Sequence, residues 1–163
     1  MKIAIADLLA LLGRKAGKDR FCLHGRMEAR LVKPDGTVIV RAKDNLIVDA
    51  GFSFIAQSIG LASGRPAVMS HIAVGTGTTA AAAGNTALVT EVLRKAATFS
   101  HTAGTKVFQF EATFNAGEAT GAITEAGVLN AASAGTMLDR VVFAVINKGA
   151  DDTLTQRFTF TMS

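Results

Sequence analysis

Apolar and polar side chains alternate with a period of two along much of the chain. In residues 107–114, three Phe residues alternate with Gln109, Glu111 and Thr113, and residues 155–161 repeat the pattern with two more Phe. Such alternation places successive side chains on opposite faces of an extended strand. The sequence therefore predicts β-strands that bury one face.

A β-hairpin is predicted near the start of this pattern. Alternating residues 27–32 and 38–43 flank Pro34-Asp35-Gly36. Pro fixes φ at the start of a tight turn, and Gly accepts the positive φ that such turns often need. We expect a hairpin with one charged face, and the apolar residues 46–48 are compatible with continuation of the sheet.

Further strand-like segments follow at regular intervals and are separated by turn-forming residues such as Ala134-Gly135. These segments are Met69–Val74, Ala87–Phe99, Lys106–Asn115, Ala119–Leu129, Met137–Asn147 and Thr155–Met162. Several short strands at this spacing favour an all-β fold, namely an antiparallel β-sandwich or a jelly-roll-like arrangement.

Two short segments have helical spacing instead. Apolar residues recur at helical intervals between Gly51 and Gly60, which predicts one short internal helix. Near the N-terminus, residues 3–13 are apolar and end at Gly13, and basic residues follow. We therefore expect residues 1–20 to form an N-terminal arm or short helix and residues 21–163 to form a single β-sandwich domain.

Charge is scarce after residue 50. Charged residues make up 18% of the chain, below the roughly 25% of an average soluble domain. Residues 1–50 hold ten Lys or Arg against six Asp or Glu, whereas residues 51–163 hold seven of each. A free monomer normally needs surface charge to stay dispersed, so we expect part of this surface to face protein.

The basic N-terminal third lacks the interleaved aromatic residues of a nucleic-acid surface, so we expect no nucleic-acid partner. Docking on an acidic protein surface, or plain solubility, is the better interpretation of its charge, and we expect the apolar residues 3–13 to pack on the body of the domain or on a neighbour. The candidate interface residues are Leu8, Leu9, Leu12, Arg14, Lys15, Lys18 and Arg20.

One motif resembles a dinucleotide-binding loop. Residues 75–80 read GTGTTA and follow a predicted strand. A true site would open a helix and place an acid at the end of the next strand. Here Gly84-Asn85 interrupts any helix, and Glu91 lies inside the following segment. A tight turn between strands is the better interpretation, with residues 80–83 in a loop.

Among the remaining polar residues, the sequence predicts no catalytic, cofactor-binding or metal-binding site. His24, His71 and His101 are isolated, and Cys22 is the only cysteine, which excludes an internal disulfide. Carboxylates could pair in space, as Glu118 with Glu125 or Asp151 with Asp152. However, acids beside turns are usually solvated, so we expect no chemistry there.

The longest uncharged stretch, residues 66–90, is broken by glycines and rich in Thr, unlike a membrane span. The apolar run 3–12 is interrupted by Asp7 and followed by Arg14 and Lys15 rather than a cleavage site. We therefore expect no membrane partner and no export through the secretory route.

Two stretches resemble small structural proteins of tailed bacteriophages, a group that includes head decoration, cement and tail-fibre proteins. The first is HIAVGTGTTA at 71–80, continuing through GNTAL at 84–88 to Glu91 and Arg94. The second is ITEAGVLNAASAGTML at 123–138, followed by RVVF at 140–143 and INKGADDTL at 146–154. The resemblance implies a non-enzymatic β-sandwich displayed on a virion that is assembled in the host cytoplasm.

The leading hypothesis from this resemblance is a capsid decoration or cement protein, forming a homotrimer that binds the major capsid protein across capsomer junctions. The alternative is a tail, baseplate or fibre-attachment protein that contacts neighbouring tail proteins. Fibres usually carry long repeats or coiled segments, and this chain has neither, which favours the head. A third possibility, a host-glycan-binding sandwich, is disfavoured because such sites stack sugars on Trp or Tyr, and the chain has none.

Overall fold

The computed structural model describes residues 21–163. The predicted helix at 3–13 lies outside the described residues. So do all the candidate interface residues: Leu8, Leu9, Leu12, Arg14, Lys15, Lys18 and Arg20.

Within the described part, nine strands and one helix confirm the predicted all-β fold with one short internal helix. The elements in chain order are β1 Leu23–Val32, β2 Val38–Ile47, α2 Asp49–Gly60, β3 His71–Gly75, β4 Glu91–Ala96, β5 Thr98–His101, β6 Val107–Phe114, β7 Gly121–Leu129, β8 Met137–Lys148 and β9 Thr153–Met162. The helix begins two residues before the predicted start, at Asp49. Among residues 21–163, no helix is long and apolar enough to cross a membrane.

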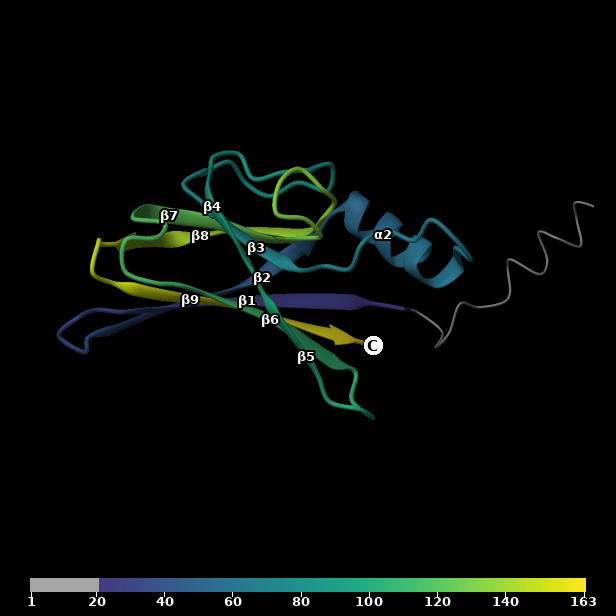
Figure 1. The fold of residues 1–163 in the computed structure, drawn as a ribbon, viewed down its shortest axis with the longest axis horizontal. Helices are drawn as coiled ribbons and strands as arrows, with labels where there is room; N and C mark the ends of the chain where they lie inside the picture. Colours follow the sequence, from purple (N-terminus) through teal and green to yellow (C-terminus); the bar gives the residue numbers. More distant parts are fainter. Residues whose placement is uncertain (1–20) are drawn as a thin grey trace, which may run out of the picture.

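The strands pair antiparallel in the order β4-β3-β7-β8-β2-β1-β9-β6-β5. They form two facing layers, with β7 and β8 in the upper layer of Figure 1 and β1 and β9 in the lower. Strand β2 joins the layers on one side, because it pairs with β1 up to Asn45 and with β8 at Leu46 and Ile47. This change of sheet is typical of sandwich corners.

On the other side the layers are joined by β4 and β5. Strand β4 pairs with β3 and β5 pairs with β6, and only Ala97 separates them. The prediction of a single strand over Ala87–Phe99 is therefore wrong in detail. Its first four residues lie in a loop, and the rest changes from one sheet to the other.

The predicted hairpin is confirmed between β1 and β2. Val32 pairs with Val38 across the turn, and the amide of Gly36 donates to the Lys33 carbonyl at 3.0 Å. Gly36 has a φ of 84°, a conformation that glycine adopts without steric strain.

The core lies between the two layers and follows the period-two pattern. In β9, Leu154, Phe158 and Phe160 are fully buried. The Phe160 ring stacks on Phe108 with centroids 5.0 Å apart and meets Phe110 edge-on at 6.2 Å. The Phe residues counted in the sequence thus form much of the sandwich interior.

Strand β7 departs from simple alternation, because residues 123–129 are all buried. One face of β7 contacts the core, and the loop that joins β3 to β4, residues 76–90, is hydrogen-bonded over part of its other face. This second covering positions the candidate site.

Candidate functional site

The loop of residues 76–90 is an uncharged surface segment. It contains no Asp, Glu, Lys, Arg or His, and most of its residues are exposed. Gly77 and Leu88 are the buried exceptions, and Leu88 packs against Val48, Ala73, Leu129 and Met137. The loop therefore presents small uncharged side chains to solvent while its C-terminal part is attached to the body.

A buried ion pair lies directly beneath this loop. Arg140 in β8 donates from Nη2 to Glu125 Oε2 in β7 at 2.7 Å and from Nε to the same oxygen at 2.9 Å. Both side chains are 0% exposed. A charge pair removed from water in this way requires further hydrogen bonds to be stable.

The Glu125 carboxylate receives those further bonds from the loop backbone. Its Oε1 accepts from the amides of Gly77 at 3.0 Å and Thr90 at 2.7 Å, and its Oε2 accepts from Val89 at 3.0 Å. Glu125 thus holds both ends of the loop against β7.

Arg140 holds the middle of the loop. Its two terminal nitrogens donate to the carbonyls of Thr79 at 2.9 Å and Ala80 at 3.3 Å, and to Asn85 Oδ1 at 3.0 Å. With the two bonds to Glu125, the guanidinium makes five hydrogen bonds, which equals its full donor capacity. Asn85 Oδ1 also accepts from the Ala82 amide at 2.8 Å, closing a turn inside the loop.

A shift in strand register allows two adjacent side chains to reach the loop. The pairing of β7 with β8 is irregular between Ile123 and Glu125. Thr124 donates from Oγ1 to the Gly77 carbonyl at 2.9 Å, next to the Glu125 contacts. Such irregularities redirect side chains that strict alternation would place on opposite faces.

The glycines of the GTG motif have a steric role here. A Cβ at Gly75 would overlap the Thr90 carbonyl oxygen, and one at Gly77 would overlap the Glu125 carboxylate. The Gly77 amide bonds Glu125 within the protein. Residues 76–80 do not form a helix, and they begin the long loop 76–90 rather than the expected tight turn between strands.

The Glu125 carboxylate remains charged at neutral pH. Burial would raise the pKa of the Glu125 carboxyl, but hydrogen bonds from the Thr90 amide, from Arg140 and from the Val89 amide outweigh burial and hold the pKa below its ordinary value. Every side-chain polar atom of the pair is engaged in a hydrogen bond within the protein.

The expectation that the acids beside turns are solvated is wrong for two of them. Glu125 is fully buried and pairs with Arg140, whereas Glu118 pairs with Lys95 at 2.5 Å. Asp152 is also buried and accepts from the Gly149 amide at 2.8 Å. None of these contacts joins Glu118 to Glu125 or Asp151 to Asp152.

The other sequence candidates remain scattered. His71 contacts the Ser70 hydroxyl, and His101 contacts the Val107 carbonyl. Cys22 is half-buried and is not in a disulfide. Among the residues from 21 onward, no group of three His, Cys, Asp or Glu side chains could hold a metal ion.

A second buried acid lies where β2 changes sheets. Asp139 in β8 accepts hydrogen bonds from the side-chain amide of Asn45 and from the backbone amide of Val128, the latter at 3.1 Å. Burial raises the pKa of Asp139 to about 7, although both hydrogen bonds favour its charged form. This carboxyl therefore changes protonation near neutral pH.

Sequence reasoning missed the Glu125–Arg140 pair, although a signal was present. Glu125 is the only charge in β7, whose other residues are mostly apolar, and such a charge is rarely buried without a partner. Two separate parts of the sequence meet here, because residues 76–90 supply the loop and residues 123–143 supply both members of the pair.

Comparisons of the chain with models of protein families, with curated proteins and with solved structures found no match.

Proposed function

We propose that the chain is a non-enzymatic structural subunit of a tailed-phage virion, most specifically a capsid decoration protein that uses loop 76–90 as a contact surface. The observation that carries this proposal is the loop itself: an exposed, uncharged surface fixed from below by the buried Glu125–Arg140 pair. The sequence resemblance supplies the virion setting.

A surface of this kind is suited to binding protein. Small uncharged side chains such as Thr78, Thr79 and Ala82 lose little hydration and little side-chain entropy when covered. Their backbone is already held by Glu125 and Arg140, so less ordering remains to be done on association. We therefore expect a modest interface per copy.

A modest interface suffices when a subunit is present in many copies. Self-association, as a homotrimer, would raise avidity because several contact surfaces engage together. The partner we propose is the major capsid protein, with the subunit bridging capsomer junctions and stabilising the head. The alternative is a tail or baseplate subunit that uses the same loop against neighbouring tail proteins.

The test is binding to phage heads that lack the protein. Ala82→Glu places a charge on the exposed loop, whereas Ala116→Glu places the same charge in an exposed turn between β6 and β7. We expect the loop variant to co-sediment with heads at least tenfold more weakly than the unaltered chain, and the control to bind normally. Equal binding of both variants would exclude the loop as the contact surface.

A further inference from the structure

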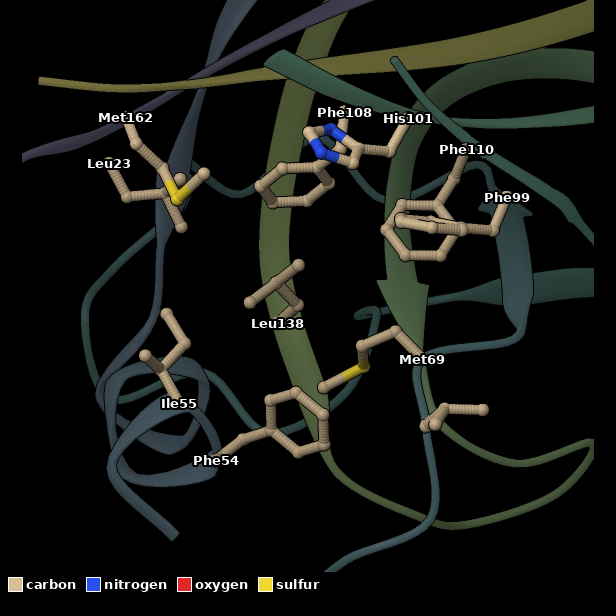
Figure 2. Close-up of a pocket in the computed structure, with 11 residues that line it drawn as sticks. Leu23, Phe54, Ile55, Met69, Phe99, His101, Phe108, Phe110, Leu138 and Met162 are labelled. Carbon is tan, nitrogen blue, oxygen red and sulfur yellow. The ribbon is translucent and has the colours of Figure 1, made fainter. Parts of the chain in front are cut away.

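An apolar groove opens between the two layers at one end of the sandwich. It has a volume of about 490 Å³ and is lined on one side by helix α2 and on the other by the Phe residues of β5 and β6. Figure 2 shows Phe54 and Ile55 facing Phe99, Phe108 and Phe110 across this space, with Leu138 between them.

The groove exposes more apolar surface than an isolated side chain would. Phe99 is 56% exposed and Val68 is 74% exposed. His101 is the one lining residue with an ionisable side chain among the described residues. Contiguous apolar surface of this kind usually marks a binding site. Because the lining is apolar apart from His101, the matching occupant is also apolar.

The described chain begins at the rim of this groove. Leu23, two residues after the first described residue, lines it, and so does Met162 near the C-terminus. Strand β1 is held there, because Cys22 and Ser163 exchange backbone hydrogen bonds at 2.7 and 3.0 Å. The end of the described domain that continues into residues 1–20 therefore lies beside the groove.

We propose that the groove is the docking site for the chain's own apolar segment, Ile3–Leu12. This segment contains six Leu or Ile residues among ten, with Asp7 the single charge. Its apolar character matches the lining, and the basic residues that follow, from Arg14 to Arg20, would remain outside in solvent.

The connecting segment is long enough for a return into the groove of the same molecule. Residues 13–20 can span about 26 Å when extended, and the groove wall begins at Leu23 itself. Gly13 and Gly17 allow the reversal of direction that this path requires. A tethered segment also has an effective concentration in the millimolar range, far above that of a second copy in dilute solution.

The test uses paramagnetic broadening in the full-length chain. Cys22 is the only cysteine, so Cys22→Ser combined with Leu9→Cys allows one nitroxide to be placed on the segment. We expect the methyl signals of Val68, Met69 and Leu138 in the groove to broaden. Those of Val38 and Val40, at the hairpin end of β2, should stay sharp.

Mixing separates the chain's own segment from that of another copy. Spin-labelled chain without isotopes is mixed with isotope-labelled chain without the spin label. We expect no broadening in the mixture. Broadening in the mixture would show that a second copy supplies the segment, and sharp groove signals in both samples would show that the segment docks elsewhere. Either result overturns the proposal.

A matched pair of variants then tests the groove wall. Phe99→Asp introduces a charge on the groove side of β5, and Thr98→Asp introduces the same charge at the adjacent exposed residue, which is not part of the lining. We expect at least a twofold loss of groove broadening in the first variant and none in the second. Equal broadening in the two would contradict docking against Phe99.

Discussion

At the scale of single residues, two buried acids in the same sheet behave in opposite ways. Glu125 has a guanidinium and three backbone amides as partners, and its pKa lies below the ordinary value. Asp139 has two uncharged hydrogen-bond donors, and burial raises its pKa to about 7. The difference follows the hydrogen bonds, because Glu125 accepts from the Thr90 amide, from Arg140 and from the Val89 amide, whereas Asp139 accepts only from Asn45 and the Val128 amide. Both side chains are inaccessible to solvent.

Removing one member of the ion pair should be strongly destabilising. In Arg140→Met, Glu125 becomes an unpaired buried charge, and we expect the free energy of unfolding to fall by about 3 to 5 kcal/mol. Urea denaturation measures this change. The matched control is Arg157→Met, which breaks the exposed Arg157–Glu111 pair of 2.6 Å and should lower stability by less than about 1 kcal/mol. Similar losses in the two variants would contradict the assignment of Glu125–Arg140 as the anchor.

Asp139 should make stability depend on pH near neutrality. The folded chain retains its proton up to about pH 7, whereas the unfolded chain releases it near the ordinary pKa of 3.8. The stabilisation from this group is therefore complete below that value and is lost as the pH rises through 7.

Asp139→Asn removes this titration. From pH 5 to pH 8, we expect the free energy of unfolding of the variant to rise relative to that of the unaltered chain, as measured by urea denaturation at each pH. Measurements above pH 5 keep Glu125, whose pKa is lowered, in its charged form. Parallel stability curves would show that Asp139 does not titrate in this range.

At the scale of elements, the strands were predictable and their change of partners was not. Alternation in β6 and β9 and the turn at residues 34–36 follow from local sequence, and both match the structure. The predicted strand breaks at Ala97, where the chain stops pairing with β3 and begins to pair with β6. This change of partner depends on contacts with residues distant in sequence. The ion pair was missed for the same reason, because Glu125 and Arg140 meet only after β7 and β8 have paired.

The loop should also depend on its glycines. A methyl group at Gly77 would overlap the Glu125 carboxylate, whereas one at Gly84 has no atom within 4 Å. We expect Gly77→Ala to lower the melting temperature by several degrees and to speed hydrogen exchange of the Val89 and Thr90 amides. Gly84→Ala should leave the exchange of both amides unchanged. Equal exchange in the two variants would show that the loop does not need the close approach at Gly77.

At the scale of the whole molecule, the sandwich combines a rigid contact surface with an open apolar end. Loop 76–90 lies on the outer side of β7 and is fixed by buried charges. The groove lies at the end where α2 packs and where the described chain begins and ends. The sequence alone showed that charge is scarce after residue 50, which favours burial of the surface by neighbouring proteins. It did not show where on the molecule the contact surface would form.

Copy number in the virion tests the proposed role most directly. Quantitative densitometry of purified particles compares the chain with the major capsid protein in the same gel lane. A decoration subunit predicts hundreds of copies per particle, in a fixed ratio to the capsid protein. A few copies, in small multiples of three or six, would place the chain in the tail, and its absence from purified particles would contradict a structural role in the virion.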